Sequence, residues 1–335
     1  MSIEVHAVTE SEREEWNEFV SNSPHGTIFH RLEFLRVLER HTKGDLHLLI
    51  GYKSEEVRGI FPFFERSIGP VRLLTSPPPG MGVPYLGPAL LNFKKMKQRK
   101  AERSNRRFIE ACLSWIDEEI APHYQYVVTD WTYADPRPFQ WNEFSCQPRY
   151  SYRLEVEDSD SLMRKITRSA RRSIQRNQDA DFEVERNDRA GVEKILDDVE
   201  TRYREEDEPC PIDGPYLRDL EASLQDDQLQ VYLGYVDCDR QTGRIVLQNG
   251  DCVYFWQGAT KPDAHVRVPV NDLLNWKTMT AAIDNGASVV DIVGANTRRL
   301  CEYKAKYNPQ LVEYYSLDRA VAGFGPLVNA YKKLR

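Results

Sequence analysis

A run of apolar residues long enough to cross a membrane is missing from this sequence of 335 residues. A membrane-spanning helix needs about 20 consecutive apolar residues, and no stretch approaches that length although 41% of the chain is hydrophobic. The first sixteen residues are acidic and have no apolar core, so they do not form a secretory signal. We expect a cytoplasmic protein without a transmembrane segment, with peripheral contact to a membrane as an open alternative.

Closely spaced cysteines are also missing. The cysteines form no Cys-x-x-Cys pair and lie far apart, at Cys112, Cys146, Cys210, Cys238, Cys252 and Cys301. Metal sites and disulfide frameworks depend on clustered cysteines, and a chain of this size needs no disulfides to stabilise its core. The spacing therefore predicts reduced thiols and no bound metal.

The motifs of several large enzyme classes do not occur. The chain has no Ser-His-Asp spacing, nucleophilic cysteine motif, Walker loop or Rossmann glycine pattern. Amide formation, in which an amine attacks an activated acyl group, needs none of these. It needs aligned reactants, an acceptor for the amine proton, and a cation or hydrogen-bond donor facing the developing oxyanion.

Positive charge is concentrated in two segments of a chain whose net charge is −7. Residues 94–107 hold eight basic side chains and one acid, and residues 164–176 hold six basic side chains and no acid. Together they carry +13, so the rest of the chain carries −20. This distribution favours local attraction to an anionic partner over a general coat for nucleic acid.

Residues 253–307 have the pattern of a βαβ unit. An apolar and aromatic run at 253–258 is followed by a helical pattern at about 270–285 and a β-branched run at 289–294. A polar turn and a short helix complete the segment at 296–307. A helical crossover predicts two parallel strands, and polar side chains then gather at one end of the sheet, where ligands usually bind.

This segment resembles the FemAB-like aminoacyltransferases of the GNAT N-acyltransferase superfamily. The similarity lies in Gln257-Gly-Ala after the aromatic strand, in Asp291-Ile-Val-Gly, and in Tyr303-Lys304-x-x-Tyr307-Asn308, where the family usually has Phe-Lys-x-x-Phe-Gly. Residues 27–35 are similar to the family's N-terminal Gly-x-x-Phe-Gln-x-x-x-Trp segment. His30 stands where the family usually has Gln, and Phe34 where it often has Trp.

An internal repeat predicts two copies of one α/β unit. Residues 47–52 resemble residues 230–235 at an offset of 183, and a polar turn and a second apolar strand follow each. The resemblance implies the same twin-domain build. We therefore expect a mixed α/β (α+β) fold with two GNAT-like units in tandem and a cleft between or beside them. The expected boundaries are 1–150 for the first unit, 151–317 for the second unit with the active site, and 318–335 for a C-terminal helix.

Two residues of the segment 253–307 are the catalytic candidates. Lys304 matches the family lysine that the resemblance links to catalysis, and an ammonium there would stabilise an oxyanion. Asp291 ends the second strand just before Gly294 and could hold an amine or accept its proton. The alternatives are a solvated surface lysine and an aspartate that caps a helix or forms a turn.

Three of the substrate-binding candidates come from a predicted helix at 161–178. Its apolar residues fall at spacings of four, and its arginines lie beside or away from that face. Arginine binds phosphate through a bidentate fork, although an ordinary solvated face is the alternative. The candidates are Arg168, Arg171, Arg172, His30, Arg31, Gln257, Arg267 and Arg298. For His30, a structural capping role is the alternative.

The hypothesis that follows is an N-acyltransferase that transfers an aminoacyl or acyl group to an amine of a sugar, peptide or cell-envelope precursor. The resemblance implies no tightly bound cofactor and a donor that acts as co-substrate, either aminoacyl-tRNA or acyl-CoA. A nucleotide-linked, lipid-linked or tRNA-borne reactant would bring the phosphate. GNAT acetyltransferases bind CoA through a glycine-containing loop, whereas residues 261–269 contain no glycine, which puts ordinary acetyl-CoA binding in doubt.

Three alternatives stay open. One is an acyl-CoA-dependent N-acetyltransferase. A second is a protein that binds nucleic acid or another polyanion through basic helices at 94–107 and 164–176, with affinity that falls steeply with salt. The third is a catalytically degenerate domain that serves protein contacts.

Overall fold

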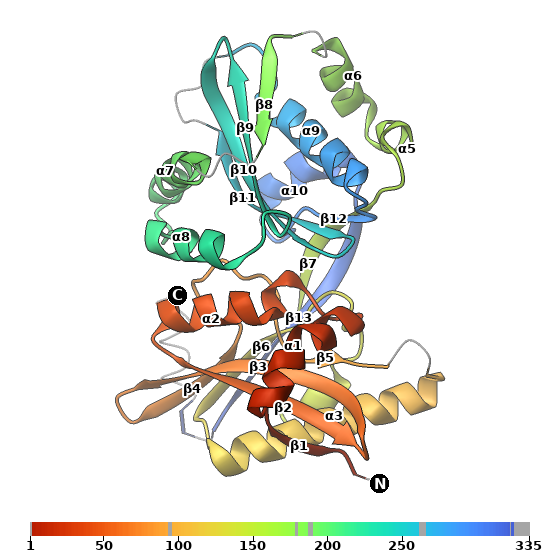
Figure 1. Ribbon diagram of the computed structural model, residues 1–335, viewed down its shortest axis with the longest axis vertical. Coiled ribbons are helices and arrows are strands. Elements are labelled where there is room, and N and C mark those ends of the chain that lie inside the picture. Colours follow the sequence, from red (N-terminus) through yellow and green to blue (C-terminus); the bar gives the residue numbers. More distant parts are fainter. Residues whose placement is uncertain are drawn as a thin grey trace. The chain divides into compact units, whose positions relative to one another are not determined.

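The computed structural model describes residues 2–92, 96–177, 180–186, 190–260, 266–321 and 323–324, which form two units (Figure 1). The first unit comprises Met1–Arg149 together with Glu313–Arg335, and the second comprises Tyr150–Val312. None of the helices in these described ranges is long and apolar enough to cross a membrane.

The sheet of the first unit has one parallel junction. Its strands lie in the order β1 (Glu4–Ala7), β2 (Asp45–Lys53), β3 (Glu56–Ile68), β4 (Val71–Ser76), β6 (Tyr124–Val128) and β13 (Gln310–Ala320). The short β5 (Ala89–Leu90) pairs with β3. Strands β4 and β6 run parallel, and the other neighbours are antiparallel.

The helices of the first unit are α1 (Glu10–Asn22), α2 (Leu32–Thr42), α3 (Gln98–Glu119), α4 (Arg137–Gln140) and the short 3-10 helix η1 (Ile28–His30). Helix α3 buries Phe108, Cys112 and Ile116 at spacings of four, as expected of one helical face. Where the Phe108 ring meets the sheet, β2 and β3 carry Gly51 and Gly59. A Cβ at Gly51 would lie 2.7 Å from the ring, so the absence of a side chain lets the ring approach.

The sheet of the second unit repeats this pattern. Its strands lie in the order β8 (Phe182–Arg186), β9 (Leu229–Val236), β10 (Asp239–Asn249), β11 (Cys252–Thr260), β12 (Val289–Asp291) and β7 (Ser145–Glu155). Strands β11 and β12 are parallel and the other neighbours antiparallel, as at the matching positions of the first unit. The predicted tandem α/β fold is therefore confirmed, and so is the βαβ unit, in which α9 (Val270–Asp284) joins β11 to β12.

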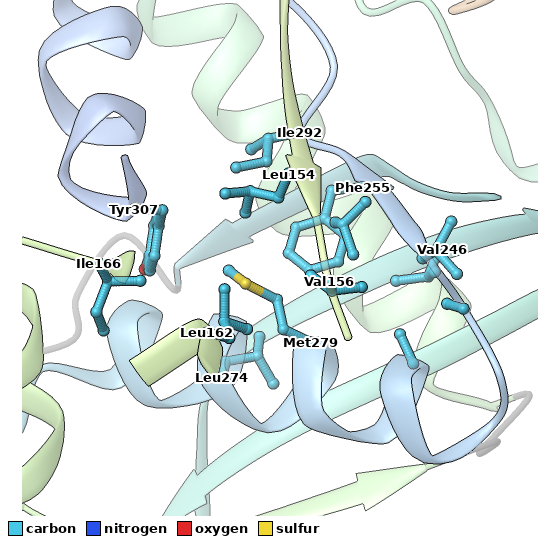
Figure 2. Close-up of a cluster of buried hydrophobic side chains, with 14 of the residues drawn as sticks. Leu154, Val156, Leu162, Ile166, Val246, Phe255, Leu274, Met279, Ile292 and Tyr307 are labelled. Atoms are coloured by element: carbon cyan, nitrogen blue, oxygen red, sulfur yellow. The ribbon is translucent and has the colours of Figure 1, made fainter. Parts of the chain in front are cut away.

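Helices cover both faces of the second sheet. Helices α7 (Ala190–Glu205) and α8 (Gly214–Ser223) lie on one face, while α5 (Ser159–Lys165), α6 (Arg168–Arg176) and α9 lie on the other (Figure 1). Apolar side chains from β7, β10, β11 and β12 meet those of α5 and α9 in one buried cluster (Figure 2). Helix α10 (Arg298–Lys304) and the short η2 (Ala305–Tyr307) follow β12 and add Tyr307 to this core.

The prediction of one continuous helix at 161–178 is wrong, because the segment forms two helices, α5 and α6. Leu162, Ile166, Ala170 and Ile174 are all buried in the core, so the apolar face is as predicted. However, Ile166 is extended and separates α5 from α6. Thr167 begins α6 by accepting a hydrogen bond from the amide of Ala170, and its own amide donates to the carbonyl of Lys306 at 2.9 Å.

The ends of two other predicted segments also differ. Residues 318–320, expected in a C-terminal helix, belong to β13, because they pair with Tyr126, Gln125 and Tyr124 of β6. Beyond them, residue 322 and residues 325–335 lie outside the described residues. Helix α3 begins at Gln98, and residues 94–95 of the first basic segment lie outside the described residues as well.

The contact between Gly51 and Phe108 gives a stability prediction. Gly51→Ala should lower the free energy of unfolding by about 1–3 kcal/mol, the usual cost of overpacking a core. Combining it with Phe108→Leu should cost less than the sum of the two single changes, because the shorter side chain leaves room for the new methyl group. Urea unfolding of the four proteins of this double-mutant cycle measures the coupling, and strictly additive costs would contradict the contact.

Candidate active site

The parallel pair of the second unit forms the frame of the site. Strands β11 and β12 pair only from Cys252 to Tyr254 on one side and from Val289 to Asp291 on the other, while β11 continues to Thr260. Beyond Asp291 the chain leaves the sheet in a turn towards α10. The carboxyl end of parallel strands is where α/β sheets usually bind ligands.

At the matching end of the first unit, the chain itself occupies this position. Tyr85 and Leu86 are fully buried, and Leu86 forms a parallel bridge to Thr129, directly after β6. The amide of Gly87 donates to the hydroxyl of Ser76 at 2.9 Å. These contacts fill the end of the β4–β6 pair with protein, so the second unit is the better candidate for chemistry.

Lys304 lies at the end of α10 and holds the turn that follows β12. Its Nζ donates to the carbonyl oxygens of Val293 and of Gly294, the latter at 2.9 Å. Val293 strains the turn because its φ is +33°, whereas Gly294 adopts its φ of +83° without strain. A β-branched residue rarely adopts positive φ, and such strain persists where the surrounding structure enforces it.

Burial lowers the pKa of Lys304 to about 8, and the positive charge of Arg244 acts in the same direction while Asp291 opposes it. At pH 7 the side chain is still mostly an ammonium. An ammonium has three N–H donors, and the two carbonyls of the turn use two of them. Among the residues that the structure describes, the third N–H has no recorded acceptor. Lys304 is therefore a partly buried cation rather than the solvated surface lysine of the alternative interpretation.

Asp291 is fully buried beneath the same turn. Its Oδ1 accepts hydrogen bonds from the Ser151 hydroxyl at 2.7 Å and from the Val293 amide at 2.8 Å. The Ser151 hydroxyl in turn accepts from the amide of Gly294 at 3.2 Å. This geometry favours the turn interpretation of Asp291 over the predicted contact with an amine, because its side chain has no exposed surface.

A second polar group joins α9 to α10 next to Lys304. Asp272 accepts from the Tyr303 hydroxyl at 3.1 Å and forms an ion pair with Lys306. Asn275 donates to the hydroxyls of Tyr303 at 3.1 Å and Tyr307 at 3.0 Å. Burial raises the pKa of both tyrosines, and the negative charge of Asp272 adds to this effect, so both stay neutral. The tyrosines that replace the family's usual phenylalanines thus have polar partners.

Two arginines that the sequence analysis did not single out lie close to this group. The Arg244 guanidinium of β10 lies 4.8 Å over the Phe255 ring, and Arg202 of α7 donates to the carbonyl of Gly258 at 2.8 Å. The positive charges of both act on Lys304. The available signal was Arg244 itself, because it is a charge placed directly before the apolar run Ile245-Val246-Leu247 of the strand.

The predicted phosphate-binding arginines of α6 differ in exposure and in hydrogen bonding. Arg168 and Arg172 are exposed. Arg171 instead donates to the carbonyls of Arg164 at 2.9 Å and Ile166 at 3.2 Å, so it caps the end of α5. The remaining exposed cations, not Arg171, are therefore the phosphate candidates of this helix.

His30 and Arg31 belong to the first unit and have structural partners there. His30 is fully buried, and its Nδ1 accepts from the Thr27 amide while its Nε2 donates to the carbonyl of Gly87 at 3.2 Å. Burial lowers the pKa of His30 to about 4. Arg31 lies 3.7 Å from the carboxylate of Glu33. The structural capping interpretation of His30 is thus favoured over the predicted cleft contact.

The other predicted binding residues are distributed over the second unit. Gln257 is buried on β11 at 8% exposure, and Arg267 is exposed just before α9. Arg298 is 93% exposed at the start of α10 and pairs with Glu302 at 3.0 Å. Residues 261–265, which belong to the segment 261–269 compared above with the CoA-binding loop, lie outside the described residues.

Within the described ranges, no three His, Cys, Asp or Glu side chains are grouped to hold a metal ion.

Comparison with known proteins agrees with this architecture. Residues 161–305 match the family described as acetyltransferase (GNAT) domain. The crystal structure of FemX is similar over 98% of this chain and 99% of that chain, with a TM-score of 0.74 and 12% identity. No curated protein sequence matches the chain.

Two further solved structures share the fold. A tandem GNAT protein from the clavulanic acid biosynthesis pathway covers 95% of this chain and 98% of its own length, with a TM-score of 0.54 and 10% identity. The structure of L-PGS from Bacillus licheniformis is similar over 89% of this chain and 94% of that chain, with a TM-score of 0.54 and 8% identity. At these identities the similarity concerns the fold.

The buried His30 predicts acid sensitivity of the first unit. Its folded pKa of about 4 lies below the usual 6.5, so below pH 6.5 the unfolded chain takes up a proton that the folded chain does not. Titration of His30 leaves the free energy of unfolding at its highest above pH 6.5 and lowers it as the pH falls towards 4. The expected decrease between pH 7 and pH 5 is about 2 kcal/mol.

His30→Gln is the matched control, because Gln has no such titration and is the residue the family usually carries at this position. Chemical denaturation at pH 7 and at pH 5 should show a smaller loss of stability in the variant than in the parent protein. Equal losses in the two proteins would contradict the buried neutral histidine.

Proposed function

We propose, on the premise that residues 161–305 form a GNAT acyltransferase domain, that the protein transfers an acyl or aminoacyl group to a primary amine in its second unit. One observation carries the proposal. Lys304, at the position of the family's lysine, is a partly buried ammonium with one N–H free of the turn, at the carboxyl end of a parallel strand pair.

The chemistry requires little beyond alignment and charge. The amine nitrogen forms a bond to the acyl carbon, the bond from that carbon to the leaving oxygen or sulfur breaks, and one amine proton ends on the leaving group. Between these events the carbonyl oxygen carries negative charge. The remaining N–H of Lys304 donates to this oxyanion, in a site where burial makes the interaction stronger than it would be in water.

Asp291 and Ser151 act as positioning residues in this proposal. They bind the amides of Val293 and Gly294, while Lys304 binds the carbonyls of the same two residues. The turn is thus fixed from both sides, and it fixes the ammonium in return. The hydrogen bonds from Tyr303 to Asp272 and from Asn275 to Tyr303 hold α10 against α9 and prevent a shift of Lys304.

For the donor we propose an aminoacyl ester, as on aminoacyl-tRNA, and for the acceptor an amine of a sugar, peptide or cell-envelope precursor. The resemblance of the Tyr303-Lys304 motif and the FemX-like fold support this choice. The lack of glycine at 261–269 removes the usual means of binding the pyrophosphate of CoA.

An acyl-CoA donor is the second candidate. It is favoured by the acetyltransferase domain match and by the similar tandem GNAT protein, whose structure is described as being without AcCoA. Parallel assays with acetyl-CoA and with mixed aminoacyl-tRNA, in the presence of a panel of amines, discriminate between the two donors.

Replacement of Lys304 tests the proposed function. Lys304→Met should lower the rate of amide formation by roughly 10²-fold, the scale of losing one oxyanion donor. Lys277→Met, which removes an exposed lysine of α9, is the control and should leave the rate unchanged. An unaffected rate in Lys304→Met would remove the residue from the reaction.

The pH dependence of the rate of amide formation is an independent test of the role of Lys304. Because the ammonium is the active form and its pKa is about 8, its contribution to the rate should fall as the pH rises through 8. Lys304→Arg keeps its charge at high pH, so any activity it retains should lack this decline. A decline of the same size in both proteins would assign the titration to another group.

We also propose that Arg168 and Arg172 bind phosphates of one reactant. Replacing both with Gln should raise KM for that reactant about tenfold and leave kcat nearly unchanged, because such contacts are equal in the ground and transition states. Replacing the exposed Arg99 and Arg103 of α3 is the control. Tight, salt-sensitive and sequence-independent binding of DNA or RNA that the double replacement on α6 abolishes would instead favour the polyanion-binding alternative.

A further inference from the structure

Arg244 has an unusual environment for a charged residue. It lies in the middle of β10, between β9 and β11, with its guanidinium over the Phe255 ring. Its Nε is buried and has no hydrogen-bond partner. Among the described residues no carboxylate pairs with it, and the polar groups that act on it are the neutral hydroxyls of Tyr303 and Tyr307.

A second guanidinium converges on the same point. Arg244 lies opposite Gly258 in the ladder of β10 and β11, and Arg202 donates to the carbonyl of Gly258 at 2.8 Å. A Cβ at Gly258 would lie 3.5 Å from the Cζ of Arg244 and 2.8 Å from the carbonyl oxygen of Gly243. The glycine is therefore required by the close approach of the β10 backbone, and the charge of Arg202 acts on Arg244 at this point.

This arrangement is unfavourable for the protein by itself. A partly buried cation without a counter-charge loses part of its hydration, and here the charge of Arg202 repels it. Contact with the Phe255 ring recovers only part of that cost. Elsewhere in the unit, buried arginine charge is compensated, as in the ion pair of Arg240 with Asp198. Groups perturbed by desolvation and by a neighbouring charge cluster at functional sites.

We propose that Arg244, with Arg202 beside it, binds a singly charged oxyanion of one reactant, either a carboxylate or a phosphodiester. The guanidinium fork matches two oxygens of either group, and one negative charge balances the uncompensated Arg244. Because the charges of both arginines act on Lys304, the bound oxyanion lies near the reacting amine or acyl group. The assignment of this anion to a reactant rests on the proposed function.

Equilibrium binding tests the site without a transfer assay. The melting temperature of the whole protein is measured in sodium chloride, sodium acetate and sodium dimethyl phosphate at equal ionic strength. Wild type should melt higher in at least one oxyanion than in chloride, and Arg244→Met should lose that shift. A response to acetate identifies a carboxylate site, and a response to dimethyl phosphate identifies a phosphodiester site.

The melting temperature of Arg244→Met in sodium chloride alone provides a second test. Removing an uncompensated buried charge should raise the melting temperature of Arg244→Met above that of wild type, whereas removing a structural ion pair would lower it. Arg244→Lys keeps the charge on a smaller head and should fold like wild type, with a reduced oxyanion shift. Arg218→Met, which removes an exposed arginine paired with Glu193, is the control and should keep the full shift.

Two outcomes would overturn the proposal: no oxyanion shift in wild type, or an equal shift in wild type and Arg244→Met. These outcomes are separate from those of the Lys304 experiments. Loss of the oxyanion site with amide formation intact would leave the proposed function standing. An oxyanion site without any transfer activity would leave the site standing and remove the transferase.

Discussion

The chemistry assigned to the second unit depends on the turn after β12, which two charged side chains hold from opposite sides. Asp291 binds its amides directly and through Ser151, and Lys304 binds its carbonyls. The turn keeps Val293 and Gly294 at positive φ, a conformation that valine does not choose by itself. In return the turn keeps an ammonium partly out of water, which explains its lowered pKa. Removing either charge would release both the strain and the position of the other group.

The two units have the same strand order and differ at the corresponding place. In the first unit the chain after β4 returns to the sheet, buries Tyr85 and Leu86, and is held by Ser76 and by the neutral His30. In the second unit the same place carries Lys304, with Arg244 and Arg202 nearby. One fold thus carries an apolar, neutral structural element in one copy and a group of cationic side chains in the other, so the fold alone does not decide what each copy does.

Local sequence patterns were sufficient for part of this account. The βαβ unit could be predicted because its apolar periodicities are local, and Lys304 could be chosen as a candidate because its motif is contiguous. The strand β13 could not, since residues 310–320 become a strand through pairing with β6, nearly 200 residues earlier in the chain. The break between α5 and α6 depends on the amide of Thr167 meeting the carbonyl of Lys306. Arg244 was not chosen from the sequence because its contact with the Phe255 ring and its lack of a carboxylate partner among the described residues depend on tertiary packing.

The central claim is that Lys304 is a partly buried ammonium that faces the oxyanion of an acyl transfer. NMR titration of the protein with isotope-labelled lysine side chains tests it directly, with Lys304→Met to assign the signal. The account predicts a pKa of about 8 for Lys304 in the free protein, and a higher pKa when a phosphonate analogue of the tetrahedral intermediate is bound, because its negative charge favours the ammonium. A pKa of about 10.5 that the analogue leaves unchanged would describe a solvated lysine and contradict the account.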